Sequence, residues 1–225
     1  MTKQQYKLIE DYMLSCMQDT AHDREHVYRV LYTALQLAQT EQNVNLDVLI
    51  AACLLHDVGR KEQFENPALC HAQVGGDKAF DFLLANGFDV EFATRVKQCI
   101  VTHRFRKNNP PTSIEAKILF DADKIDVVGL LGVARSLVYV GEMREPLYTL
   151  NGDGSVSDGS NTDEPSFFRE YHFKLSKLYD RFFTESGRRL AESRRQAAVD
   201  FYNNLLQECS APYINGVDLL TDILK

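Results

Sequence analysis

The chain has 225 residues, 44% of them apolar, which is enough for a packed core and excludes general disorder. It carries 32 acidic and 25 basic residues, and this balance argues against non-specific nucleic-acid binding, which needs a basic surface. The five scattered cysteines are typical of reduced thiols, and the N-terminus lacks the apolar stretch of a signal peptide. No apolar run reaches the ~20 residues of a membrane span. We therefore expect a cytoplasmic protein that binds neither nucleic acid nor a membrane.

Helical periodicity dominates the first half of the chain. Residues 23–40 repeat apolar side chains every three or four positions, with Asp23 as the expected N-cap. The segment LDVLIAACLLHDV, 46–58, is apolar on nearly every side and predicts a central helix that is covered all round. Two more helices are expected, one over 70–88 that ends at Asn86-Gly87 and one over 89–103.

The second half continues the helical pattern. One long helix is predicted from 113 to about 140, followed by a loop over 145–165 whose Gly/Ser/Asp-rich part does not match a calcium-binding loop. Two amphipathic helices follow, over 166–183 and 185–209, and no strand-like alternation is longer than a few residues. We expect an all-α protein with one domain over 1–225, a core of about 20–140, and C-terminal helices of about 165–225 packed on it.

Ligand-type side chains lie at the ends or on the apolar faces of these predicted helices: His26, His56, Asp57, His71, His103 and Asp123. A single buried histidine is more often a hydrogen-bonded core residue than a ligand. Together, however, imidazole nitrogens and carboxylate oxygens suit manganese, iron, cobalt or zinc. No cysteine belongs to the pattern, which argues against a structural zinc site.

The motifs resemble, in order, those of the HD superfamily of metal-dependent phosphohydrolases. They read HDREHVYRV, LLHDVGRKE, CHAQVGGDKA, VTHRF, EAKILFDADKIDVVGLLGVAR and KLSKLYDRFFTESGRRLAESR, from about residue 20 to 208. They are similar to a bacterial subgroup that includes HD-domain nucleoside triphosphate pyrophosphohydrolases. The resemblance implies an HD-domain helical bundle and one set of metal ligands: His26, His56, Asp57 and Asp123.

Asp126 competes with Asp123 for the last ligand position. We prefer Asp123 because Ala122-Asp123 matches the closing Ala-Asp of the family, and Asp126 would then hold a ligand or a water. His71 and His103 either hold a second metal, as in some HD enzymes, or bind a substrate phosphate. We expect a single metal, because the subgroup looks mononuclear. Manganese is our first expectation, with magnesium, iron, cobalt, nickel or zinc as alternatives.

Basic residues on or near the motifs are expected to hold phosphate charge. With His71, His103 and Asp126, Arg60 and Lys61 form the predicted catalytic set. The predicted substrate-binding set is Arg104, Arg106, Lys124 and Arg135. Arg60 stands where several HD enzymes have a glutamate, so neither a general acid nor a general base is assigned.

The resemblance implies hydrolysis of a (deoxy)nucleoside triphosphate to a monophosphate and pyrophosphate. One alternative is a two-metal phosphodiesterase or dinucleoside polyphosphate hydrolase. Another is a nucleotide sensor without catalytic activity. The expected partner is a small nucleotide or another phosphate substrate, and the apolar, aromatic C-terminal segment is a candidate homodimer interface.

Overall fold

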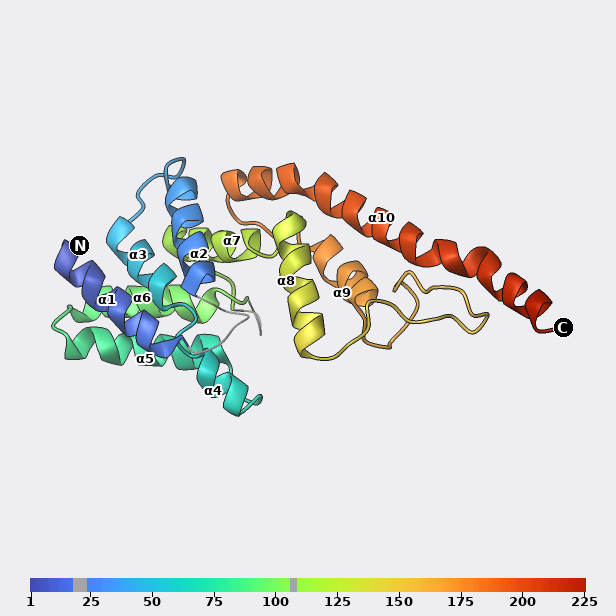
Figure 1. The fold of residues 1–225 in the computed structure, drawn as a ribbon. Helices are drawn as coiled ribbons and strands as arrows, with labels where there is room; N and C mark the ends of the chain where they lie inside the picture. The colour runs from blue at the N-terminus through green and yellow to red at the C-terminus, as the bar shows by residue number, and fades with distance from the viewer. Residues whose placement is uncertain (18–23, 106–108) are drawn as a thin grey trace. The chain divides into compact units, whose positions relative to one another are not determined.

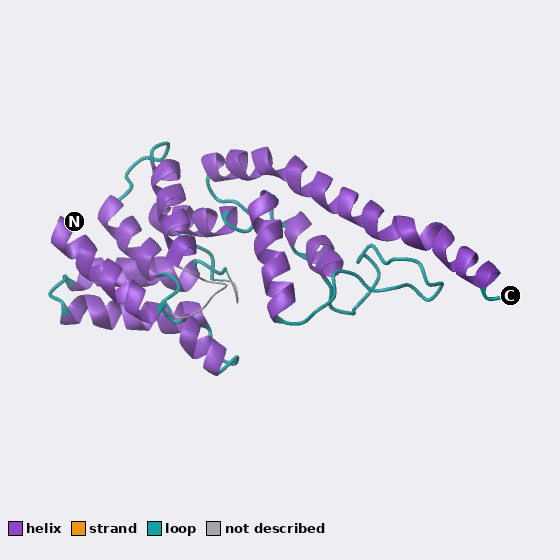
Figure 2. Cartoon of the chain, viewed as in Figure 1, coloured by secondary structure: helices purple, strands orange, loops and turns teal. Residues whose placement is uncertain are grey.

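The computed structural model describes residues 1–17, 24–105 and 109–225, which form two compact units. The first unit comprises 1–126 and 182–189, and the second comprises 127–181 and 190–225. Regular structure in the described residues is helical (Figure 2), apart from one isolated bridge between Leu150 and Val156. The all-α prediction is confirmed. A single domain over 1–225 stays a prediction.

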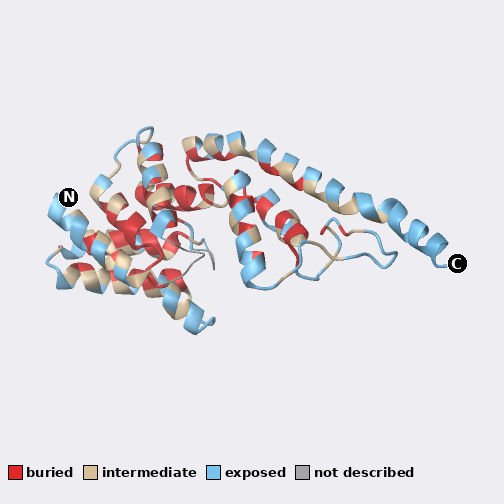
Figure 3. Ribbon diagram, viewed as in Figure 1, coloured by how far each residue is buried: buried red, intermediate tan, exposed pale blue. Residues whose placement is uncertain are grey.

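The first unit surrounds one apolar helix. Its helices are α1 (Lys3–Cys16), α2 (Arg24–Ala38), α3 (Leu46–Leu55), α4 (Arg60–Glu65), α5 (His71–Ala85), α6 (Val90–Thr102) and α7 (Ile114–Ile125), as Figure 1 shows. Helix α3 contacts α1, α2, α5, α6 and α7, and seven of its ten residues are buried (red in Figure 3). Its apolar composition therefore reflects a position at the centre of the core.

Side-chain caps set the beginnings of the helices that lead to the core. Asn45, Asp89 and Ser113 each accept a hydrogen bond from a backbone N–H three residues further on, at 3.1, 2.8 and 3.1 Å. Helix α5 ends at Asn86, before Gly87 with a φ of 80°. The predicted cap Asp23 lies outside the described residues.

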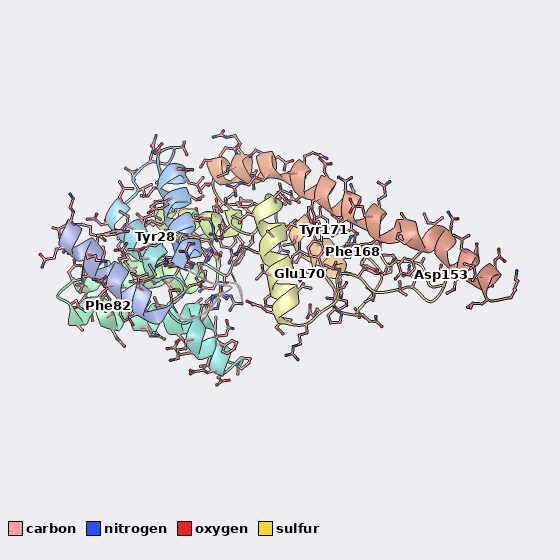
Figure 4. The ribbon with its side chains drawn as sticks, in the orientation of Figure 1. Tyr28, Phe82, Asp153, Phe168, Glu170 and Tyr171 are labelled. Atoms are coloured by element: carbon pink, nitrogen blue, oxygen red, sulfur yellow. The ribbon has the colours of Figure 1, made fainter. Side chains whose placement is uncertain are left out.

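The second unit contains α8 (Gly129–Glu142), α9 (Phe167–Phe173), a short 3-10 helix (Leu175–Lys177) and most of α10 (Glu185–Ile223). Tyr171 of α9 stacks on Tyr202 of α10 with ring centroids 4.2 Å apart, and Phe168 meets Tyr202 edge-on at 5.5 Å. Phe168 and Tyr171 lie together on α9 in Figure 4, whereas Asp153 lies in the loop that the sequence predicted. These rings form an aromatic core that joins α9 to α10.

Three predicted helix boundaries are wrong. The segment 113–140 is broken between α7 and α8, where Gly129 has a φ of 68° and a Cβ atom would lie 2.7 Å from Arg194 Cβ. The predicted helix over 166–183 ends at Phe173 and gives way to the 3-10 helix, while α10 continues through Pro212 to Ile223. Periodicity did not reveal these points because apolar side chains continue across the break.

No helix among the described residues has the length and apolar character needed to cross a membrane. The cytoplasmic location and the homodimer stay predictions.

Candidate metal centre

Helix ends bring the ligand-type residues of the sequence together in the first unit. His26 lies in the first turn of α2, His56 and Asp57 directly follow α3, and His71 is the first residue of α5. His103 caps the C-terminal end of α6, and Asp123 lies in the last turn of α7. All of these side chains are buried. They form two sets of side chains that could each bind a metal ion, here called donor sets.

The first donor set is His26, His56 and Asp123, whose ligand atoms all lie within 4.8 Å of one another. Nε2 of His26 is 3.4 Å from Nε2 of His56 and 3.5 Å from Oδ1 of Asp123. The second donor set is Asp57, His71 and His103. Nε2 of His71 lies 3.3 Å from Nε2 of His103 and 3.3 Å from Oδ1 of Asp57.

Asp57 belongs to the second donor set, but one of its carboxylate oxygens also lies close to the first. Its Oδ2 lies 3.7 Å from Nε2 of His26 and 3.5 Å from Nε2 of His56, while its Oδ1 faces His71 and His103. Both oxygens are buried, and neither accepts a hydrogen bond from the residues that the structure describes. Arg60 Nε lies 3.0 Å from Oδ1 as an ion pair. A buried carboxylate without hydrogen bonds is costly, and a bound cation removes that cost, so the donor set fits a divalent metal.

Hydrogen bonds on the far ring nitrogens orient the histidines. Nδ1 of His56 lies 2.7 Å from the carbonyl oxygen of Cys53, and Nδ1 of His103 lies 2.6 Å from that of Ile100. A carbonyl oxygen can only accept, so each Nδ1 donates and each Nε2 is left bare in the neutral ring. A bare Nε2 is the form that binds a metal.

His26 is oriented by a carboxylate. Its Nδ1 lies 2.7 Å from Oδ2 of Asp126, and Arg29 donates to both oxygens of Asp126, at 2.7 and 3.1 Å. Asp126 therefore contacts the ring nitrogen opposite the one that faces Asp123. Arg29 follows His26 by three residues on the same helix face, and this spacing is the signal that could have indicated its contact with Asp126.

Burial and neighbouring charges shift the pKa values of these groups toward the forms that bind a cation. Burial lowers the pKa of His56 and of His71, and it lowers that of His103 to about 3. Burial opposes the ionisation of Asp57 and Asp123, but neighbouring positive charges, led by Arg60 and Lys124 respectively, hold the pKa of both carboxyls well below its usual range. At neutral pH these three histidines are therefore neutral, and the carboxylates of Asp57 and Asp123 are charged.

Only some of the basic side chains that the sequence predicted for the site lie beside the donor sets. Lys124 Nζ lies 2.6 Å from Oδ2 of Asp123, and Arg104 Nη1 lies 3.2 Å from Nδ1 of His71. Lys61 instead lies 4.0 Å from Glu65 on the exposed side of α4. Arg135 belongs to α8 of the second unit, and Arg106 lies outside the described residues.

Sequence reasoning missed two residues beside the cluster. Gln63 Oε1 lies 2.5 Å from Nδ1 of His71, and no motif indicated it. Asp121, to which no role was assigned from the sequence, is buried and accepts hydrogen bonds from the backbone N–H groups of Phe183 and Thr184, at 2.9 and 2.7 Å, and from the Thr184 hydroxyl. It fixes the segment before α10 to α7.

Comparison with known proteins identifies the same part of the chain. Residues 24–128 match the family model described as HD domain. YpgQ of Bacillus subtilis (strain 168) is 29% identical over 208 residues, which cover 91% of this chain and 90% of YpgQ. A crystal structure of Bacillus subtilis YpgQ in complex with ADP has a TM-score of 0.70 at 25% identity and covers 90% of this chain and 97% of that one.

A crystal structure of a predicted HD superfamily hydrolase from an uncultured Thermotogales bacterium is 28% identical to this chain. It covers 92% of each chain with a TM-score of 0.60. A structure from Lactobacillus plantarum is 25% identical, covers 94% of this chain and 99% of that one, and has a TM-score of 0.72. The likeness therefore extends well beyond the segment that the family model matches.

Proposed function

Since the chain belongs to the HD superfamily of hydrolases, we propose that it is a metal-dependent phosphohydrolase acting on a small nucleotide. The proposed reaction cleaves a (deoxy)nucleoside triphosphate to a monophosphate and pyrophosphate. The buried carboxylate of Asp57, whose oxygens accept no hydrogen bond from the described residues, is the observation that carries the proposal. The ADP complex of YpgQ supports a nucleotide as the ligand.

We assign the first metal to His26, His56 and Asp123 together with Oδ2 of Asp57. This mixture of imidazole and carboxylate donors suits manganese, and it also accepts magnesium, iron, cobalt, nickel or zinc. A divalent cation neutralises phosphoryl oxygens and lowers the pKa of water, so that a nucleophile exists near neutral pH. Asp126 would keep the His26 ring in the orientation that presents Nε2, because its carboxylate accepts the Nδ1 proton.

The side chains around the donor sets provide positive charge for a polyphosphate. Lys124 contacts Asp123, Arg60 contacts Asp57, and Arg104 lies beside His71. We assign these cations to the phosphate oxygens that the metal does not neutralise, since charge-assisted bonds to phosphate are strong and directional. Arg106 and Arg135 stay predicted contributors from the sequence.

A second candidate function is a two-metal phosphodiesterase or dinucleoside polyphosphate hydrolase. The bare Nε2 of His103 favours it, because that atom can bind a cation but cannot donate a hydrogen bond to a phosphate oxygen. The Arg60 guanidinium favours a single metal instead. It lies beside Oδ1 of Asp57, which is the oxygen that faces His71 and His103 and would bind a second metal. The number of Mn²⁺ ions bound per chain at saturation distinguishes the candidates.

The experiment is a hydrolysis panel with Mn²⁺ for the native chain and for Asp57→Asn, with products separated by chromatography. Ribonucleoside and deoxyribonucleoside triphosphates, cyclic nucleotides and dinucleoside polyphosphates are the substrates. We expect a monophosphate and pyrophosphate from the triphosphates with the native chain, and loss of this activity in Asp57→Asn.

Asp77→Asn is the matched control, since Asp77 pairs with Lys97 on the surface of α5. It should retain native activity. Turnover of none of these substrates by the metal-saturated native chain would refute the proposed reaction class, and nucleotide binding without turnover would favour a sensor.

A further inference from the structure

Gln63 of α4 contacts His71 on the side of the ring that faces away from Asp57 and His103. Its Oε1 is 2.5 Å from Nδ1, whereas Nε2 of the ring faces Asp57 and His103. We propose that Gln63 is a positioning residue: it fixes the tautomer of His71 and thereby makes the second donor set able to bind a cation. The metal-binding part of this inference rests on the two-metal candidate under the proposed function, whereas the tautomer does not.

The orientation of the Gln63 amide follows from its second contact. Nε2 of Gln63 lies 2.9 Å from the carbonyl oxygen of Leu69. That oxygen can only accept a hydrogen bond, so the NH2 end of the amide must face it. The opposite orientation would set two oxygens against each other. The amide oxygen is therefore the atom that faces His71.

The tautomer of His71 follows in turn. An amide oxygen can only accept, so Nδ1 must carry a proton to donate to it. In the neutral ring, Nε2 is then bare, and it lies 3.3 Å from Oδ1 of Asp57 and 3.3 Å from Nε2 of His103. Arg104 Nη1 lies 3.4 Å from the same amide oxygen and 3.2 Å from Nδ1 of His71. A guanidinium can only donate, so its contact with Nδ1 alone would favour a bare Nδ1, but the 2.5 Å contact between Nδ1 and the amide oxygen is shorter and requires the proton on Nδ1. We therefore assign Arg104 as a further donor to the amide oxygen. Both donors favour the same amide orientation.

Helix α4 links two members of the second donor set. Gln63 contacts His71, and Arg60, one turn earlier, pairs with Oδ1 of Asp57. The helix is held in turn by Lys78, whose Nζ lies 2.6 Å from Glu62 and 2.8 Å from the carbonyl oxygen of Val58. The second donor set thus depends on α4 for both its carboxylate and one of its rings.

His71 differs in this respect from the other histidines of the cluster. The rings of His56 and His103 are oriented by carbonyl groups one turn earlier in the chain, and His26 is oriented by Asp126 of the neighbouring helix. In the contacts among the described residues, His71 is the one ring of these four that contacts a side-chain amide. A change at position 63 should therefore affect the second donor set and leave the first intact.

The first test measures the tautomer directly, by nitrogen-15 NMR of the histidine rings in the metal-free full chain. We expect a protonated Nδ1 and a bare Nε2 for His71 in the native chain and in Gln63→Glu, which keeps the acceptor. Gln63→Leu removes the acceptor with little change of volume and should shift His71 toward the tautomer with a protonated Nε2. Gln73→Leu is the control, because Gln73 is exposed on α5 and contacts Asp77.

A protonated Nε2 on His71 in the native chain would overturn the inference, and so would an unchanged tautomer in a folded Gln63→Leu chain. Because this measurement needs neither metal nor substrate, its result is independent of the proposed reaction. An absence of hydrolysis would refute the reaction and leave the tautomer standing.

The second test titrates Mn²⁺ into the same chains and follows the free ion by electron paramagnetic resonance. Loss of an orienting partner typically weakens metal binding by about 10- to 100-fold. We expect a loss of that size for the second equivalent of Mn²⁺ in Gln63→Leu, recovery in Gln63→Glu, and an unchanged first equivalent. An equal loss at both equivalents indicates general damage and would contradict the assignment of Gln63 to His71 alone.

Discussion

Gly59 and His71 approach each other so closely that a Cβ atom on Gly59 would lie 2.4 Å from the carbonyl oxygen of His71. The same atom would lie 2.5 Å from the backbone nitrogen of Gly75. Both neighbours are backbone atoms that cannot rotate away, so only glycine allows the turn after Asp57 to lie against the first turns of α5. This contact places Asp57 and His71 in one donor set.

Gly59→Ala should therefore separate these two segments. We expect a loss of about 1–3 kcal/mol in the free energy of unfolding, as is typical of overpacking, and weaker metal binding. Urea denaturation monitored by circular dichroism measures the first effect. Gly141→Ala is the matched control: no atom lies within 4 Å of its added Cβ, and alanine stabilises a helix by up to about 1 kcal/mol over glycine. Equal stability of Gly59→Ala and native protein would contradict the close contact.

Asp126→Asn tests the orientation of His26. The amide keeps the size of the side chain but is a weaker acceptor for Nδ1, so we expect the dissociation constant for the first Mn²⁺ to rise by about 10- to 100-fold. Titration calorimetry of the full chain measures it. Asp11→Asn, an exposed carboxylate paired with Lys7 on α1, should bind Mn²⁺ as the native chain does. Native affinity in Asp126→Asn would remove Asp126 from this role.

Asp121→Ala tests the attachment of the segment before α10. The substitution leaves the backbone N–H groups of Phe183 and Thr184 without their acceptor, and each buried unsatisfied group costs about 1–3 kcal/mol. The free energy of unfolding should fall by at least that amount, and Asp121→Asn should lose less because it keeps one acceptor oxygen. An unchanged unfolding midpoint in Asp121→Ala would show that water replaces the carboxylate.

Stability of the metal-free protein should depend on pH through the buried histidines. Burial lowers the pKa of His103 from 6.5 to about 3, and it also lowers that of His56 and His71. Below pH 6.5 the unfolded chain therefore binds more protons than the folded chain, and stability falls as the pH falls. The slope reaches about 1.4 kcal/mol per pH unit for each ring.

Urea denaturation in the presence of a chelator, between pH 7.5 and pH 5.5, measures this slope. His103→Gln removes one of the three rings and should flatten the dependence. A stability that rises toward pH 5.5 would mean that the rings are protonated in the folded chain.

The sequence predicted the all-α class and the helices that bring ligand-type residues into the core. Apolar periodicity determines both, because burial of one helix face needs that spacing. The helix break near Gly129 could not be predicted in this way, since it depends on a positive φ and on close contact with Arg194. Local pattern carries no information on such distant neighbours.

The candidate site, like the fold, was predicted from the sequence only in part. Motif order identified the ligand-type residues, but the roles of Gln63 and Asp121 depend on tertiary contacts with residues 8 and 62 or more positions away. Gln63 belongs to no motif, and Asp121 lies within EAKILFDADKIDVVGLLGVAR without an assigned role. Both have side chains that are common on helix surfaces. Their partners distinguish both residues, and burial distinguishes Asp121. The metal ligands and the catalytic and substrate-binding residues stay predictions for experiment.

The most direct measurement is an anomalous difference map from crystals of the full chain grown with Mn²⁺. Our account predicts a peak bonded to Nε2 of His26, Nε2 of His56, Oδ2 of Asp57 and a carboxylate oxygen of Asp123. A further peak at His71 and His103 would add the second metal. A map at saturating Mn²⁺ without a peak among the first four residues would contradict the account.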